Sequence, residues 1–249
     1  CAVMSRKVKA RIAFGIAGVI AAFLILFALA MSYFHEKMEV SPSPESPTVQ
    51  ITDDGFPVVD WEYWQGVNPD VIGWVTVPGT VIDYPIVQAP SDDPDYYLHH
   101  DVYRDYNVYG VPYLDVDCAD TGLFDSRNAV VFGHHMNDGS MFAAFADYSN
   151  LDFANEHARI LVQTPEAKKV YLARCVDIVN GTELAKRTDF NDETDYREWY
   201  DSQLSGADVV IDAITQPQTA ITFCTCSYNY SSNERTLVVA SPDTAYLID

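Results

Sequence analysis

The sequence predicts a mainly β domain, a closed or nearly closed β-barrel with a few peripheral helices, preceded by one N-terminal membrane-spanning helix. Three observations support this. Short segments rich in β-branched and aromatic residues recur after about residue 70. The few segments with helical spacing do not alternate with them as in βαβ folds. An uncharged run, 12–34, precedes all of them.

The first 34 residues have the pattern of a cytoplasmic segment followed by a membrane helix. Residues 12–34 can span a hydrocarbon core of about 30 Å as a helix. The segment 1–11 contains four basic residues, so the positive-inside rule predicts a cytoplasmic N-terminus and an extracellular remainder. A cleaved signal peptide is the alternative, because Ala28-Leu-Ala30 resembles a cleavage site. The apolar run is longer than the usual h-region, which favours an uncleaved anchor.

Residues 35–57 are expected to form an extracellular linker, since Ser41–Pro47 alternates Ser and Glu with Pro. Residues 58–249 then suffice for one globular domain. The chain carries a formal net charge of −21, and four of its 15 Lys and Arg residues lie in the N-terminal segment 1–11. Nucleic-acid binding is therefore disfavoured, because it requires a basic face.

The five cysteines do not form a disulfide framework or a zinc motif, because they are odd in number and scattered. Cys118 and Cys175 are interpreted as small core or loop residues, although a disulfide between them is an alternative outside the cell.

In chain order, a short helix is expected near Asp60–Gln65 with Asp60 as its cap. The strands Val71–Val77 and Val81–Val87 follow, and Pro85 in the second implies an edge or a bulge. Aromatic, strand-like segments come next at Tyr96–Leu98 and Tyr109–Leu114.

The second half begins with a buried strand, Asn128–Gly133, followed directly by His134 and His135. Apolar residues at helical spacing predict a helix over 141–148, and further helical spacing predicts one over Thr194–Leu204. Between them, Arg159–Thr164 and Lys169–Val179 are expected to be strands.

The stretch Ile221–Cys226 is expected to be a strand with alternating faces. Ile221, Phe223 and Thr225 then face the core, whereas Thr222, Cys224 and Cys226 point the other way. If the next strand returns antiparallel, it begins with Arg235 beside Cys226. A nearby cation favours the thiolate, which is the nucleophilic form of cysteine.

Each of three residues, taken alone, is weak evidence for catalysis. A cysteine such as Cys226 is usually a small buried side chain, a histidine such as His134 is often simply hydrogen-bonded, and an arginine such as Arg235 is usually a surface charge. Together they match the needs of one reaction. A thiolate attacks a carbonyl carbon, a histidine supplies a proton to the leaving amine, and an arginine stabilises the oxyanion.

With these residues in place, the chain resembles the sortases, specifically class B, over nearly all of 58–249. Several ordered motifs carry the resemblance: Asn68–Trp74, Pro78–Thr80, Ile82–Gln88, Tyr96–Leu98, Phe132–Met136, Met141–Phe142, Thr222–Cys226 and Arg235–Val239. The resemblance implies a closed eight-stranded barrel, with Cys226 as nucleophile, His134 rather than His135 as general acid, and Arg235 as the contact to the oxyanion or the substrate.

Further implications concern the reaction and its partners. The resemblance implies a membrane-anchored transpeptidase of Gram-positive cell walls that cleaves a C-terminal sorting signal of surface proteins after Thr. A thioacyl enzyme forms, and an amine of a lipid-linked peptidoglycan precursor resolves it. The sorting motif is expected to be of the NPxTN or PxTG kind, and the resemblance implies no metal or organic cofactor.

Two residues beside the nucleophile, Cys224 and Thr225, each have two interpretations. Cys224 departs from the family pattern; it is interpreted as a small-residue substitution, and the alternative is oxidative cross-talk with Cys226. Thr225 is a candidate substrate contact through its backbone or hydroxyl, although its side chain should face the other way.

Three alternative functions share parts of this pattern. A cysteine endopeptidase or amidase would pass the acyl group to water. A pilus-polymerising sortase would use a pilin lysine as acceptor. A silent adhesion domain would keep the barrel without the chemistry, which the presence of Cys226, His134 and Arg235 argues against.

Overall fold

The structure is a computed structural model that describes residues 24–28, 51–182, 186–213, 217–227 and 233–243. The chain divides into two units, Cys1–Ser41 and Pro42–Asp249, and each is described by itself. In the first unit the described residues, 24–28, are helical. Among all the described residues, no helix has the length and apolar character needed to span a membrane. Most of 12–34, and all of Ser41–Pro47, lie outside the described residues, so the anchor and the Pro-rich linker stay predictions.

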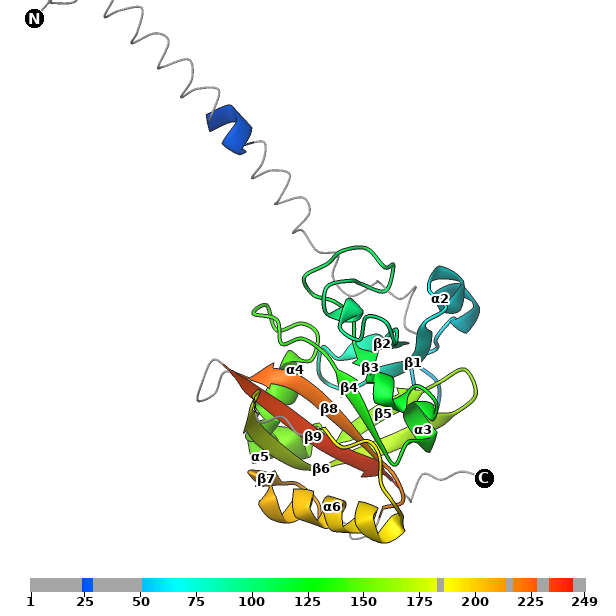
Figure 1. The fold of residues 1–249 in the computed structure, drawn as a ribbon, viewed down its shortest axis with the longest axis vertical. Coiled ribbons are helices and arrows are strands. Elements are labelled where there is room, and N and C mark those ends of the chain that lie inside the picture. Colours follow the sequence, from blue (N-terminus) through cyan, green and yellow to red (C-terminus); the bar gives the residue numbers. More distant parts are fainter. Residues whose placement is uncertain (1–23, 29–50, 183–185, 214–216, 228–232, 244–249) are drawn as a thin grey trace, which may run out of the picture. The chain divides into compact units, whose positions relative to one another are not determined.

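Eight strands of the second unit close into a barrel (Figure 1), which confirms the predicted closed, mainly β barrel. They are hydrogen-bonded in the order β5-β1-β2-β3-β4-β8-β9-β6, the pairing of β5 with β6 closes the ring, and β7 extends β6 outside it. The strand bounds are β1 Val71–Thr76, β2 Asp83–Gln88, β3 Tyr113–Leu114, β4 Asn128–Phe132, β5 Arg159–Gln163, β6 Lys168–Asn180, β7 Val209–Val210, β8 Ala220–Ser227 and β9 Glu234–Pro242.

Strand direction brings three chain segments to one rim of the barrel. β4 and β8 run parallel, so they end at the same rim. β8 and β9 run antiparallel, so the first residues of β9 lie beside the last residues of β8. The end of β4, the end of β8 and the start of β9 therefore meet.

A continuous apolar core fills the barrel. Phe142, Phe145 and Phe223 are fully buried in it, and the rings of Phe145 and Phe223 are stacked with their centroids 4.9 Å apart. The predicted helix over 141–148 is shorter than expected: α4 spans Ala143–Ala146 and continues as a 3-10 turn, Asp147–Ser149. Its aromatic side chains face inward, as predicted.

The predicted helices near Asp60–Gln65 and over Thr194–Leu204 are confirmed, and an aspartate caps each of them. The carboxylate of Asp60 accepts from the Tyr63 amide at the start of α2, Trp61–Val67. Asp192 caps α6, Glu193–Gly206, whose Tyr196, Trp199 and Tyr200 pack on the outside of the barrel. Figure 1 shows α6 lying along β6 and β9. The remaining helices are α3 Gly122–Asp125, α5 Leu151–Glu156 and the 3-10 helices Tyr96–Leu98 and Val116–Cys118.

Two sequence expectations about strands are wrong. Tyr96–Leu98 is a 3-10 helix, because burying Tyr97 lets its hydroxyl donate to Asp70 at 2.6 Å, a contact that outweighs strand propensity. Of Tyr109–Leu114 only Tyr113–Leu114 forms a strand. Pro85 is tolerated because β3 pairs with β2 only at Val87 and Gln88, so β3 does not require an N–H from Pro85.

The last residues of the predicted linker contact the barrel. Phe56 is buried against Leu161 and Val170, and the side chain of Gln163 donates to the Pro57 carbonyl at 3.0 Å. Residues 56 and 57 therefore pack against β5 and β6, and the boundary between linker and catalytic domain at residue 58 stays a prediction.

Candidate active site

The rim where β4, β8 and β9 meet carries all three residues that the sequence singled out for chemistry. Cys226 is paired directly with Arg235 across the antiparallel β8–β9 ladder. Phe132 is paired with Cys224 in the parallel β4–β8 ladder, and His134 and Cys226 each come two residues later. Cys226, His134 and Arg235 therefore lie at one rim of the barrel, as the sequence predicts. Their catalytic roles stay predictions.

Cys226 is the partly exposed thiol of this rim. Cys118, Cys175 and Cys224 are buried, and all four described cysteines are free, so the alternative disulfide between Cys118 and Cys175 is absent. Burial raises the pKa of Cys175 to about 12. Only Cys226 combines access from solvent with a neighbouring cation among these described thiols.

His134 is half-buried, and its Nε2 lies 2.8 Å from the carbonyl oxygen of Leu98. A carbonyl oxygen can only accept, so Nε2 carries a proton. Nδ1 is therefore the ring nitrogen that can accept or release a proton while this bond stays intact. Burial lowers the pKa of His134, and the positive charges of His99 and Arg235 lower it further.

We expect the pKa of His134 to lie below its ordinary value of about 6.5 and to rise in His99→Gln. The rings of His99 and His134 are stacked with centroids 6.3 Å apart, and removing a neighbouring cation favours the charged imidazolium. The measurement is an NMR titration of the imidazole nitrogens in selectively labelled full-length protein. His157→Gln, whose histidine contacts the Pro78 carbonyl, is the control; a shift there of equal size, or none in His99→Gln, contradicts the prediction.

Arg235 is the second residue of β9 and lies at the same rim, paired with Cys226. Its Nη1 donates to the carbonyl of Glu234 at 2.9 Å, which orients the guanidinium. The guanidinium also lies close to Gly181, where an added Cβ would be 3.1 Å from Cζ. The positive charge acts on both neighbouring groups, lowering the pKa of His134 and opposing the rise in that of Cys224.

Cys224 points to the same face as Cys226 but is only 2% exposed. Burial raises the pKa of its thiol to about 12, so the thiol stays protonated. A buried, protonated thiol is a poor partner for oxidation, which favours the interpretation of Cys224 as a small packing residue.

Thr225 does not fit the hydroxyl contact expected from the sequence. Its side chain is 1% exposed on the core face of β8, and its hydroxyl has no hydrogen-bond partner among the described residues. The alternation of the strand turns this hydroxyl away from the face of Cys226. A contact through the backbone of Thr225 stays a prediction.

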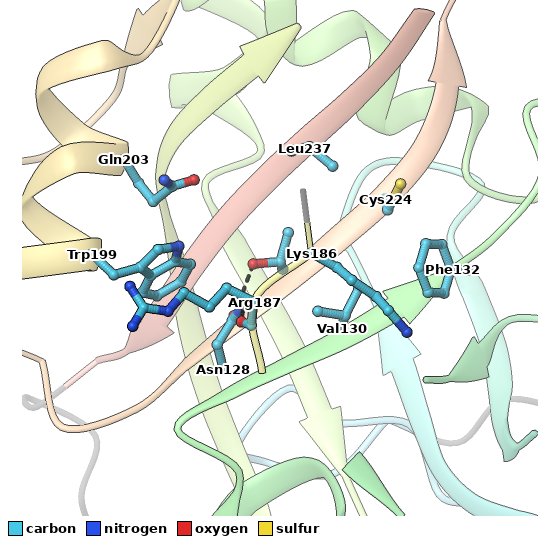
Figure 2. A pocket seen from close by; sticks show the side chains of 10 residues that line it. Asn128, Val130, Phe132, Lys186, Arg187, Trp199, Gln203, Cys224 and Leu237 are labelled. Atoms are coloured by element: carbon cyan, nitrogen blue, oxygen red, sulfur yellow. Dashed lines mark hydrogen bonds between the residues drawn. The ribbon is translucent and has the colours of Figure 1, made fainter. Parts of the chain in front are cut away.

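A small cavity lies next to Cys224 on the outer face of β4 and β8. Its volume of about 20 Å³ holds roughly one water molecule. Figure 2 shows Trp199 and Gln203 of α6 at one side of it and Phe132 and Cys224 at the other. The outer face of β4 and β8 thus lies between α6 and the end of β8, where Cys226 is found.

Lys186 and Arg187 also line this cavity, and no sequence pattern indicates their position there. Lys186 Nζ binds Asp115 at 2.7 Å and Asp117 at 2.9 Å. The carbonyl of Arg187 accepts from the Asn128 amide at 2.8 Å. These contacts join positions more than 50 residues apart, so no local pattern could reveal them.

The chain is similar to known proteins in sequence. The family model described as the sortase domain matches residues 75–243. A curated relative, sortase B of Listeria monocytogenes, is 36% identical over 134 residues, which are 51% of this chain and 53% of the relative. The chain thus spans about half the length of that relative.

Solved structures of similar fold include two sortases of class B. Clostridium perfringens sortase B has a TM-score of 0.66 at 30% identity, covering 73% of this chain and 98% of that one. A Staphylococcus aureus sortase B–substrate complex has a TM-score of 0.64 at 25% identity, covering 73% and 83%. This chain therefore has the fold of both sortases.

Proposed function

Because the chain belongs to the sortase family and matches its class B members, we propose that it is a cysteine transpeptidase that cleaves a sorting signal after Thr and transfers the acyl group to an amine. One observation carries the proposal. The strand register places Cys226 opposite Arg235, and the parallel ladder from β4 leads to His134 at the same rim. No other described thiol shares that combination of exposure and charge.

The first half-reaction uses each residue for one step. The thiolate of Cys226 attacks the Thr carbonyl carbon, forming a C–S bond and a tetrahedral oxyanion that the Arg235 guanidinium stabilises. As the C–N bond breaks, Nδ1 of protonated His134 donates a proton to the leaving amine. A thioester on Cys226 and a neutral His134 remain.

The second half-reaction reverses these roles. An acceptor amine attacks the thioester carbonyl, Arg235 again stabilises the oxyanion, and Nδ1 of neutral His134 takes the proton that the amine loses. The thiolate leaves and a new amide bond is made. Because the pKa of His134 is lowered, the imidazolium is a minor form at neutral pH, and the pair of Cys226 thiolate and His134 imidazolium is a minor population.

The proposal places the Thr of the sorting peptide at the rim where β4, β8 and β9 meet, beside Cys226 and Arg235. The cavity beside Cys224, about 20 Å³, is too small for a peptide, so the rest of the sorting signal lies outside it. The substrate complex of the S. aureus relative supports binding of a sorting signal by this fold. A lipid-linked peptidoglycan precursor is the proposed source of the acceptor amine.

Residues 12–34 are proposed to anchor the enzyme in the cell membrane with the catalytic unit outside. The uncharged run and its preceding basic residues support this orientation. An anchored enzyme meets both a secreted sorting signal and a lipid-linked acceptor at one surface. Fractionation of cells, with protease added outside, tests it: the protein should sediment with membranes and its catalytic unit should be cleaved.

The enzymatic proposal is tested with full-length protein in detergent. Fluorogenic peptides of the NPxTN and PxTG kinds are incubated with and without an oligoglycine amine, and products are identified by mass spectrometry. We expect amine-dependent ligation to the Thr-terminated fragment. Hydrolysis alone at every amine concentration would instead indicate a cysteine endopeptidase or amidase, and acceptance only of a lysine side chain would indicate pilus polymerisation.

A further inference from the structure

The backbone ladder between β4 and β8 stops just before the candidate nucleophile. The Gly133 amide donates to the Cys224 carbonyl at 3.1 Å. Hydrogen bonds in a parallel ladder recur every two residues, so the next one would join the backbone amide of His135 to the carbonyl of Cys226. In its place, Nδ1 of the His135 ring lies 2.9 Å from the Cys226 carbonyl oxygen.

The backbone turns away at this point for an identifiable reason. His135 forms an antiparallel bridge with Met141, and the Phe142 amide donates to the His134 carbonyl at 2.7 Å. The loop is closed tightly, because Met141 adopts a φ of 57° and a Cβ on Gly133 would lie 2.4 Å from the Phe142 ring. The imidazole of His135 thus takes the position that a backbone amide would hold in a regular strand pair.

The chemistry of this bond fixes the tautomer of His135. The Cys226 carbonyl can only accept, so Nδ1 of His135 must carry a proton. Both the neutral Nδ1–H tautomer and the imidazolium meet that requirement. The bond therefore survives titration of the ring, unlike a bond in which Nδ1 would have to accept.

We propose that His135 is a positioning residue that holds the peptide of Cys226 in place from the β4 side. The amide of Ser227, on the other side of that peptide, faces β9, where Ser227 is paired with Glu234. Replacing the last backbone hydrogen bond by a side-chain one keeps the end of β8 in register while the backbone after Gly133 departs. This inference rests on the proposed function, in which Cys226 is the nucleophile.

The chain allows a matched set of variants. His135→Asn keeps an amide N–H about where Nδ1 lies, His135→Gln moves the donor one carbon further out, and His135→Leu removes it. A misplacement of the nucleophile by about 1 Å can cost up to roughly 100-fold in rate. We expect kcat to fall roughly 10- to 100-fold in His135→Leu, with KM changed less than about 3-fold, and His135→Asn to recover most of the loss.

The experiment uses full-length protein in detergent and two readouts. Transpeptidation gives kcat, KM and the pH profile, whose midpoints should stay unchanged because the proposed bond transfers no proton. Alkylation of Cys226 by chloroacetamide, followed by intact mass, should slow in the same variant order. Because alkylation needs no sorting peptide, it still reports on His135 if the transpeptidase proposal itself fails.

Three results would overturn the inference. His135→Leu with unchanged kcat and alkylation rate shows that the bond is dispensable. Equal losses in His135→Asn and His135→Leu show that a donor at this position does not matter. Loss of the acid limb of the pH profile shows that His135 transfers a proton. Melting curves accompany each variant, and if His135→Leu does not fold, the comparison of His135→Asn with His135→Gln decides.

Discussion

Cys226→Ala is expected to abolish thioester formation and ligation, with a loss of more than about 10⁴-fold, because it removes the only atom that forms the covalent bond to the substrate. Cys224→Ala should retain activity within a few-fold. The two thiols lie on one face of β8, yet Cys224 is 2% exposed and burial raises its pKa to about 12. Their comparison therefore separates the nucleophile from a packing residue two positions away.

Intact mass of full-length protein after incubation with a sorting peptide measures the thioester, and liquid chromatography with mass spectrometry measures ligation. Removing the buried sulfur in Cys224→Ala is expected to cost about 1 kcal/mol of unfolding free energy, so a melting curve shows whether the variant is folded at the assay temperature. A folded Cys224→Ala protein without any activity, or an active Cys226→Ala protein, would overturn the assignment.

The faces of β8 could be predicted because a strand has a strict period of two. Ile221 and Phe223 lie in the barrel core, and Cys224 and Cys226 lie on the opposite face, as the alternation required. The return of β9 beside Cys226 followed from the short connection between the strands. Local chemistry therefore determined the placement of the thiol and the guanidinium.

Other parts of the site depend on contacts between distant segments and could not be predicted. The Leu98 carbonyl that fixes the tautomer of His134 is 36 residues away, and His135 contacts a carbonyl 91 residues away. The side chain of Lys186 reaches Asp115 across 71 residues. The contact of His135 with Cys226 arises only once the parallel pairing of β4 with β8 is in place, and neither strand's own pattern specifies its partner.

Arg235→Gln is expected to lower kcat for thioester formation by roughly 10²- to 10³-fold, because it removes the positive donor aimed at the developing oxyanion. Arg235→Lys should recover only part of the loss, since an ammonium lacks the planar fork of the guanidinium. KM should change much less than kcat, because the charge on the oxyanion exists only in the transition state. Steady-state kinetics over a range of peptide concentrations separate the two constants.

Arg235 also acts on His134, so its loss has a second effect that must be distinguished. Its charge lowers the pKa of His134, and the acid limb of the pH profile should therefore move to higher pH in Arg235→Gln. A shifted profile with kcat restored at the new optimum would mean that Arg235 only tunes His134. A fall in kcat that persists at every pH is the result expected for a group that stabilises the oxyanion.

Gly181→Ala tests the same role without altering the guanidinium itself. The added methyl carbon would lie 3.1 Å from Cζ of Arg235 and 2.8 Å from Oδ1 of Asn233, so the side chains must move. A displaced donor loses part of its transition-state stabilisation, and we expect a loss in kcat of roughly 10-fold. Gly66→Ala, where the new methyl meets nothing within 4 Å, is the control. If both variants keep full activity, the position of the Arg235 side chain is not critical, and its assignment as the oxyanion contact is wrong.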